Sequence, residues 1–363
     1  MGRNNVIQFN KFDYQKNLSQ QRELFRECFP ENNGTTVETI EHYYWKFHSF
    51  PGKKKSYEYI AESESSILGY YAALPYEYLI GNDKVRVGMV CDVMTGIKAR
   101  GKGIFTQLGK FATDELKKEE LVFTTGYPIR PEVIPGHLKV GWEIIFDLPL
   151  FIGVIKIDSI LKSKKLGYLT PIIRVIFSRL KKIMGYLSEI DSKFYIDVFT
   201  NKQIDKIDKL EEFIARWSHG KKIVLNKTSD FLKWRLNAPG KEYDIIVLSE
   251  NEKIVGVAIA RFVIKEKIPS FALLDIMILE DNKLYSKNMF RAIYKIAEKK
   301  NAECLLIMSS NPTAKKLNFF RNGLLKSPYK FKLIIKRLNS QYTDDLILNQ
   351  DNWNLMWIDS DDL

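Results

Sequence analysis

The stretch that decides the fold runs from Val90 to Leu108 and reads VCDVMTGIKARGKGIFTQL. It opens with an apolar run, passes through a segment rich in glycine and basic residues, and ends where apolar residues begin to recur at helical spacing. The stretch therefore predicts a strand, a tight basic turn and a helix in direct succession. Strands that lead directly into helices are the building units of α/β proteins.

The turn in this stretch predicts a binding site for an anion. The first backbone N–H groups of a helix have no partner inside the helix and lie at the positive end of its dipole. Gly101 and Gly103 carry no side chain that would block a close approach, and Arg100 and Lys102 add positive charge. We expect phosphate or pyrophosphate to bind here, while an ordinary strand–helix turn is the alternative. The glycine spacing fits neither a P-loop nor a dinucleotide-binding turn.

The chain repeats itself with a period of about 185 residues. Similar segments occur in the same order in both halves, and their offset is nearly constant, as expected for a duplication. The matching pairs are 45–47 with 234–236, 67–70 with 254–257, 92–94 with 275–277, 127–128 with 311–312, and 139–142 with 321–324.

Both halves predict the same order of elements. Each begins with a helix, continues with a β-hairpin and a long apolar strand, and ends with an amphipathic helix, an apolar strand and a short helix. The helix and strands are expected at 18–28, 56–62, 66–74, 86–95 and 121–125, and again at 205–217, 243–249, 253–262, 270–279 and 304–308. This order favours an α/β fold around a mixed sheet. We predict two similar domains at 1–155 and 195–340, a basic and largely helical connector at 156–194, and a tail at 341–363.

Composition limits the partners of this 363-residue chain. Its 56 basic and 44 acidic residues leave a charge of +12, which favours phosphorylated small molecules, nucleic acid or an acidic membrane surface. Cys28, Cys91 and Cys304 form no paired motif, so a reducing compartment, the cytoplasm, is expected. The four histidines lack metal-site spacing, and no apolar run is long enough to span a membrane. The sequence therefore predicts no metal and no membrane span.

The segment Arg100-Gly101-Lys102-Gly103-Ile104 resembles the R-x-x-G-x-G/A turn of the GNAT acyltransferases, the GCN5-related N-acetyltransferases. The resemblance covers most of 18–155 and, more weakly, about 205–330, so it implies two tandem GNAT-like domains. It also implies that acetyl-coenzyme A is the co-substrate, with its pyrophosphate on the turn and its pantetheine arm along the preceding strand. The residues implied are Val93, Met94, Thr95, Arg100, Gly101, Lys102, Gly103, Ile104, Phe105 and Thr106. Phe105 replaces a small residue of the family pattern, and we expect its ring to point into the core.

Acyl transfer from a thioester needs a base for the acceptor amine and benefits from a proton donor for the leaving thiolate. The family's usual donor is a tyrosine four residues before the glycine that ends the short helix; His137 stands at that position here, with Tyr127 as a second candidate. Asp92, on the strand that leads to the turn, is the candidate base. An ordinary helix-end histidine is the alternative for His137, and a structural role shared with its repeat mate Asp275 is the alternative for Asp92.

The second half departs from the pattern. Its turn at 279–286 lacks paired glycines and carries Glu280 and Asp281, which would repel pyrophosphate. We therefore predict that the second domain does not bind coenzyme A and is structural or completes a substrate cleft. The acids of the tail, Asp359, Asp361 and Asp362, either bind an amino group of a substrate or belong to a frayed, solvated end.

Together these features predict a cytoplasmic acyl-coenzyme A-dependent N-acetyltransferase whose acceptor is a small amine, such as an amino sugar or a sugar nucleotide. Two alternatives remain open. One is an aminoacyl-tRNA-dependent transferase of tandem-domain type, and the other is a non-enzymatic module that binds nucleic acid or coenzyme A. No nucleic-acid partner is expected, because no basic motif interleaved with aromatic residues is visible. The acyl chain and the oligomeric state are not predicted.

Overall fold

The computed structural model describes residues 6–64, 66–157, 189–279 and 282–362. Most of the predicted connector at 156–194 therefore lies outside the described residues. The chain divides into two compact units. Unit 1 comprises Met1–Phe146, Ala238–Gly240 and Lys332–Asn349, and unit 2 comprises Asp147–Asn237, Lys241–Phe331 and Gln350–Leu363. No helix in the described ranges combines the length and apolar character of a membrane span.

Unit 1 is built on a mixed sheet, as predicted. Its strands, in spatial order, are β1 (Gln8–Lys11), β2 (Tyr57–Ser63), β3 (Ser66–Ile80), β4 (Asp83–Thr95), β5 (Phe123–Gly126) and the end of β13 (Leu324–Arg337). The β4–β5 pair is parallel, and the other pairs are antiparallel. The strands β3 and β4 form a longer hairpin than the sequence predicted, because the polar residues near its tip continue the ladder to Ile80 and Asp83.

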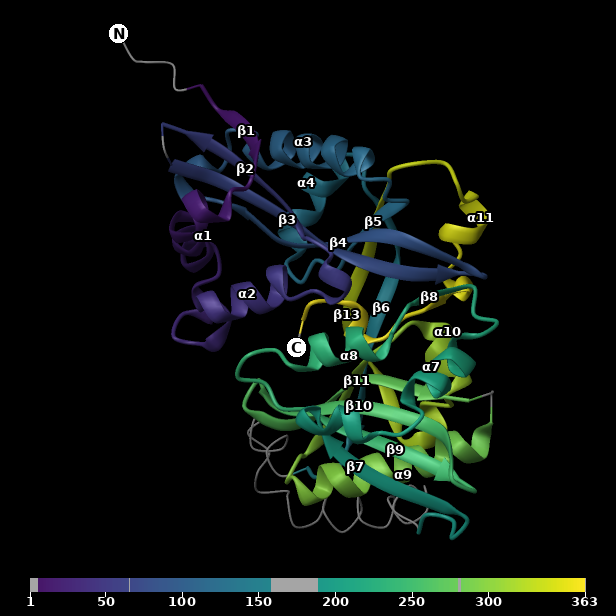
Figure 1. Cartoon of the computed structure of the whole chain (residues 1–363). Helices are drawn as coiled ribbons and strands as arrows, with labels where there is room; N and C mark the ends of the chain where they lie inside the picture. The colour runs from purple at the N-terminus through teal and green to yellow at the C-terminus, as the bar shows by residue number, and fades with distance from the viewer. Residues whose placement is uncertain (1–5, 65, 158–188, 280–281, 363) are drawn as a thin grey trace. The chain divides into compact units, whose positions relative to one another are not determined.

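Helices cover both faces of this sheet (Figure 1). Neighbouring side chains of a strand point to opposite faces: Tyr71 packs in the core with helix α3 (Ile104–Lys118), while Tyr70 meets the ring of Phe47 in helix α2 (Ile40–His48). The helices described in unit 1 are α1 (Tyr14–Cys28), α2 (Ile40–His48), α3 (Ile104–Lys118), α4 (Ile134–Lys139) and the short α11 (Asp344–Ile347). The α3 helix buries Ile104, Leu108, Ala112 and Leu116 at a spacing of four, which confirms its predicted amphipathic character.

The strands β4 and β5 pair over only part of their length, and this opens the sheet. Their register runs from Val87 opposite Phe123 to Val90 opposite Gly126, where β5 ends. β4 continues to Thr95 and stays paired with β3 as far as Gly69. The register with β3 shifts at Asp92, whose φ of 47° marks a β-bulge. Residues 91–95 thus have a strand neighbour on the β3 side and lie beyond the end of β5.

Unit 2 repeats this order of elements. Its sheet runs from the end of β6 (Glu143–Val154) through β12 (Cys304–Met308), β11 (Ile268–Ile278), β10 (Lys253–Lys265) and β9 (Asp244–Glu250) to β7 (Phe194–Thr200), with β11 and β12 parallel. Its helices include α7 (Leu210–Ser218), α8 (Ser229–Leu236), α9 (Lys283–Lys299) and α10 (Asn311–Lys316). α9 follows β11 as α3 follows β4, and its apolar face completes a large core. The repeat in the sequence therefore has a counterpart in the order of elements, and duplication remains our interpretation of both.

The last strand of each sheet comes from the other half of the chain. Residues Leu150–Val154 of β6 pair with β12, and residues Ile334–Arg337 of β13 pair with β5. The compact units therefore differ from the linear ranges 1–155 and 195–340. A strand's alternating pattern tells which side chains are buried, but it does not identify the partner strand.

The end of the chain is packed inside unit 2. Strand β14 (Trp353–Asn354) pairs with β8 (Ile223–Leu225), and the turn η10 (Trp357–Asp359) follows it. Trp353, Trp357 and Asp359 are at most 2% exposed. The expectation of a frayed, solvated tail is therefore wrong for this part. The two indoles and the apolar residues around them explain the difference, because they remove a large apolar surface from water.

Candidate functional site

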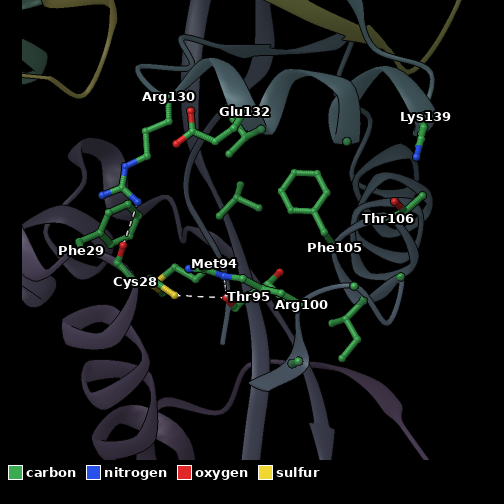
Figure 2. Close-up of a pocket in the computed structure, with 17 residues that line it drawn as sticks. Cys28, Phe29, Met94, Thr95, Arg100, Phe105, Thr106, Arg130, Glu132 and Lys139 are labelled. Carbon is green, nitrogen blue, oxygen red and sulfur yellow. Dashed lines mark hydrogen bonds between the residues drawn. The ribbon is translucent and has the colours of Figure 1, made fainter. Parts of the chain in front are cut away.

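A cavity of about 520 Å³ lies in unit 1 where β4 ends and α3 begins. The end of α1, the end of β4, the glycine turn and the segment around α4 form its walls (Figure 2). All but one of the predicted coenzyme-binding residues line it, and Lys102 is the exception. The residues lining it are Val93, Met94, Thr95, Arg100, Gly101, Gly103, Ile104, Phe105 and Thr106. Residues that the sequence places in one short stretch thus form one side of a single cavity.

The glycine turn has the backbone that an anion site requires. Gly101 and Gly103 have backbone φ angles of 77° and 75°, which residues other than glycine rarely adopt. Gly103 is also the N-cap residue of α3, so no side chain of its own caps the first turn of the helix. A Cβ atom at Gly101 would meet no atom within 4 Å, so the turn is open on that side. The first N–H groups of α3 can therefore donate to a bound phosphate.

Contacts from α1 and β3 hold the loop that leads into the turn. The N–H of Ile97 donates to Glu27 Oε1 at 2.5 Å, and the N–H of Gly96 donates to the carbonyl of Leu68 at 2.9 Å. The carbonyl of Thr95 accepts from Arg100 Nε at 3.3 Å and from Cys28 Sγ at 3.5 Å. Glu27 could not be predicted from the sequence, because a helical glutamate carries no motif that links it to a distant loop.

The opposite wall adds charges that the sequence analysis missed. Arg130, Glu132 and Lys139 line the cavity there, so three basic side chains, counting Arg100, face one acid. Arg130 donates to the carbonyl of Cys28 at 2.9 Å and to Glu31 at 2.5 Å, and its guanidinium lies 5.0 Å from the ring centre of Phe29. This basic lining favours a ligand with several negative charges. These residues stand singly in the sequence, so only their convergence in the fold reveals them.

Phe105 does not point into the core as expected. Its half-buried ring lies at the cavity (Figure 2), and Ile104, only 1% exposed, takes the core position. The ring fits closely against Gly136, where an added Cβ atom would come within 2.5 Å of Phe105 Cε1. The difference is one of helical phase: the core stripe of α3 begins at Ile104, so the next side chain turns toward the cavity.

His137 is buried between two aromatic rings and does not line the cavity. Its ring centre lies 5.1 Å from that of Phe105 and 5.0 Å from that of Trp142. Burial lowers the pKa of His137 to about 4, so the imidazole is neutral at pH 7. A neutral imidazole is a poor acid, and this environment favours the structural alternative over the predicted proton donor.

The other two predicted catalytic residues also lie outside the cavity lining. Asp92 forms an ion pair with Lys46 in α2, with 2.8 Å between Oδ1 and Nζ, and both side chains are largely buried. The hydroxyl of Tyr127, which directly follows β5, lies 3.4 Å from that of Tyr78. Both aspartates of the repeat are held by a lysine, since Asp275 lies 2.7 Å from Lys227 in unit 2. A shared structural role for Asp92 and Asp275 therefore stays open beside the catalytic prediction for Asp92.

Known proteins resemble this chain in sequence over residues 14–145 and in fold over most of its length. Residues 14–145 match the family model of the GNAT acetyltransferase domain. No curated protein sequence matches the chain significantly.

Solved structures resemble almost the whole chain. A GCN5-related N-acetyltransferase from Anabaena variabilis is 12% identical, with a TM-score of 0.65, and the match covers 92% of this chain and 73% of that one. A probable N-acyltransferase from Enterococcus faecalis has 10% identity, a TM-score of 0.66 and the same coverage. N-myristoyltransferase from Saccharomyces cerevisiae, solved with myristoyl-CoA, has 11% identity and a TM-score of 0.58, with 91% of this chain and 79% of that chain covered. At these identities the likeness concerns the fold. Residues 14–145 therefore match the GNAT acetyltransferase domain, and the chain as a whole shares its fold with these solved structures.

Proposed function

We propose that this protein transfers the acetyl group of acetyl-coenzyme A to the amine of a small molecule, such as an amino sugar or a sugar nucleotide. The observation that carries the proposal is the cavity of unit 1, which joins an open glycine turn at a helix start to the free end of β4. The family match supports acyl transfer, and the myristoyl-CoA in the yeast relative supports a coenzyme A thioester as donor.

The proposed mode of binding follows from the two walls. The pyrophosphate would accept hydrogen bonds from the first N–H groups of α3, with Arg100 beside it. The pantetheine arm would lie along residues 93–95. This part of β4 extends beyond the end of β5, so its backbone could form hydrogen bonds with an extended ligand. Arg130 and Lys139 would face the remaining phosphate charge from the opposite wall. Backbone donors near Thr95 would stabilise the oxyanion, each contributing about 3 kcal/mol.

Proton transfer is assigned to Asp92 as base and Tyr127 as donor. The Lys46 ammonium holds the Asp92 carboxylate in place, so that it can take the proton of the amine directly or through one water molecule. His137 is the less favoured donor, because its buried imidazole would first have to take up a proton. The three cysteines are buried and form no disulfide with one another, which is typical of a reducing compartment, and we propose the cytoplasm.

Titration calorimetry with acetyl-coenzyme A tests the donor. We expect a Kd well below about 1 mM and a loss of at least about tenfold when Arg100 and Lys102 are both changed to Glu. A panel of amines and amino sugars, assayed by the thiol released from the coenzyme, tests the acceptor. Absence of binding at millimolar acetyl-coenzyme A would refute the proposal. A gel shift with tRNA that falls steeply with salt would instead favour the nucleic-acid alternatives.

A further inference from the structure

A second cavity, of about 340 Å³, lies in unit 2 at the same place among its elements. The end of α7, the end of β11, the start of α9 and the α10 segment line it, as the end of α1, the end of β4, the start of α3 and the α4 segment line the cavity of unit 1. The repeated order of elements therefore reproduces the cavity, but at a smaller size. Volumes near 300 Å³ are at the lower limit for small-molecule sites.

The tail of the chain lies beside this second cavity, and its Asn354 lines the cavity. Met356 forms an antiparallel bridge with Ser309, directly after β12, and the N–H of Ser310 donates to the carbonyl of Leu355 at 3.0 Å. The η10 turn of the tail packs against β11. The tail thus occupies the gap beside β11 that stays open beside β4 in unit 1. A long extended arm such as pantetheine has no channel here.

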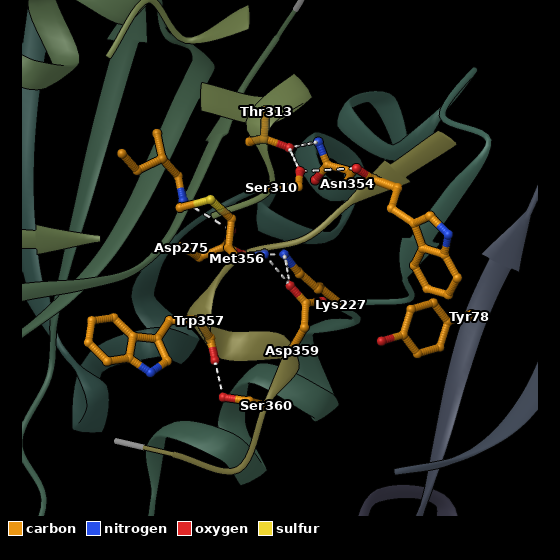
Figure 3. A network of polar contacts seen from close by, with 12 residues as sticks. Tyr78, Lys227, Asp275, Ser310, Thr313, Asn354, Met356, Trp357, Asp359 and Ser360 are labelled. Carbon is orange, nitrogen blue, oxygen red and sulfur yellow. Dashed lines mark hydrogen bonds and ion pairs between the residues drawn. The ribbon is translucent and has the colours of Figure 1, made fainter. Parts of the chain in front are cut away.

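Buried polar contacts fix the tail in that gap (Figure 3). Lys227 lies 2.7 Å from Asp275 and 3.8 Å from Asp359, and all three side chains are fully buried. The N–H of Met356 donates to Asp359 Oδ2 at 2.6 Å. Removing one partner of such a group leaves an unpaired buried charge, so the tail is held firmly. The cavity of about 340 Å³ is the space that the packed tail leaves open to a ligand.

The remaining cavity is basic at its rim and polar at its floor. None of its lining residues in the described ranges is acidic, whereas Glu280 and Asp281, the predicted repelling acids, lie outside those ranges. The rim carries Arg216, His219, Lys221 and Lys316. Ser286, Thr313 and Asn354 lie deeper, and the Oδ1 atom of Asn354 is buried without a hydrogen-bond partner in the described structure. A buried acceptor of this kind calls for a donor from a ligand or from water.

Ile276, Ile278 and Leu317 add an apolar wall to the same cavity, and Trp217 lies beside it with the ammonium of Lys221 4.5 Å from the centre of its ring. Phosphate suits the basic rim, hydroxyl groups suit the Asn354 acceptor, and the C–H face of a sugar ring suits the apolar wall. We propose that unit 2 binds a sugar phosphate in this cavity, at a site separate from the acyl donor site of unit 1. The inference goes beyond the proposed acetyl transfer and does not require it.

Calorimetric titration of the full chain with glucose 6-phosphate tests the inference. We expect a Kd below about 1 mM, and binding at least about tenfold weaker for glucose and for inorganic phosphate, because each supplies only half of the contacts. Failure of glucose 6-phosphate to bind at about 10 mM would overturn the inference. Inorganic phosphate binding as tightly as glucose 6-phosphate would also overturn it, because the sugar would then not be recognised.

Charge reversal locates the site. The double change Arg216→Glu and Lys316→Glu is expected to weaken glucose 6-phosphate binding by about tenfold or more. Lys315→Glu is the matched control, since Lys315 is exposed on the same helix and does not line this cavity. Equal losses in the control and the double variant would contradict the assignment. The pair Arg100→Glu and Lys102→Glu should leave sugar phosphate binding unchanged, and a loss there would place the ligand in unit 1 instead. Acetyl-coenzyme A binding, measured on the same samples, separates this outcome from failure of the proposed acyl transfer.

Discussion

The carboxylate of Glu27, in the last turn of α1, accepts the backbone N–H of Ile97 at 2.5 Å. Ile97 begins the short 3₁₀ turn η4 (Ile97–Ala99), which leads directly into Arg100 and the glycine turn. The contact ties the loop before the proposed phosphate site to a helix far away in the sequence. A hydrogen bond to a charged group contributes roughly 1.5–3 kcal/mol when it is well formed.

We predict that Glu27→Ala weakens acetyl-coenzyme A binding by about three- to tenfold, because the loop loses one fixed point and must be ordered on binding. Glu23→Ala is the control, since Glu23 is exposed one turn earlier on the same helix. Calorimetry and the KM for the coenzyme measure the effect, and the KM for the acceptor should not change. Equal coenzyme affinities of the two variants would show that the Glu27 contact does not position the turn.

Phe105→Ala should raise the pKa of His137. Burial is what lowers this pKa to about 4, and the ring of Phe105 covers one side of the imidazole. Removal of the ring admits water, so the pKa moves toward the ordinary value near 6.5. A proton NMR titration of the imidazole measures the shift. Phe111→Ala is the control on the same helix, because Phe111 packs against Phe9 and Tyr59 instead. An unchanged His137 pKa in Phe105→Ala would mean that other groups bury the imidazole.

His137→Phe should make the protein less sensitive to acid. The folded-state pKa of His137 is depressed, so its contribution to stability is present above about 6.5 and is lost as the pH falls through about 4. Across this pH range the wild type loses about 3 kcal/mol of its free energy of unfolding through His137. Urea unfolding of wild type and variant at pH 7 and at pH 4.5 measures it. The same variant tests the mechanism: loss of turnover at pH 7 with the fold intact would restore His137 as a catalytic residue.

Asp359→Asn should change the pH dependence of stability in the opposite direction. Burial raises the pKa of Asp359 to about 6, despite the opposing charge of Lys227. The folded state therefore binds this proton more tightly than the unfolded state, and the stabilisation is present below about 4 and is lost as the pH rises through about 6. Wild type should lose up to about 3 kcal/mol from this group across that window, and the variant should not. Asp351→Asn, an exposed position of the same tail, should behave as wild type in urea unfolding. Parallel pH profiles for Asp359→Asn and wild type would contradict the assigned pKa.

The strand–turn–helix unit could be predicted from the sequence because its determinants are local. Positive φ requires glycine at 101 and 103, and the core stripe of α3 follows from apolar residues at a spacing of four. These short-range constraints also bring most of the predicted coenzyme-binding residues to one cavity. Phe105 shows the limit of this reasoning, because a shift of one residue in helical phase turns a side chain from the core to the cavity.

The sequence by itself determined the mixed α/β class, the repeated order of elements and the glycine turn, because propensity and spacing act over a few residues. Only the tertiary structure decided which strand closes each sheet, since β6 and β13 pair with strands of the other half of the chain. It also decided the burial of the tail beside β11 and the neutral state of His137 between two rings. Pairing and burial depend on segments that are distant in the sequence. Their energies are set by water removed at the contact, which no local pattern records.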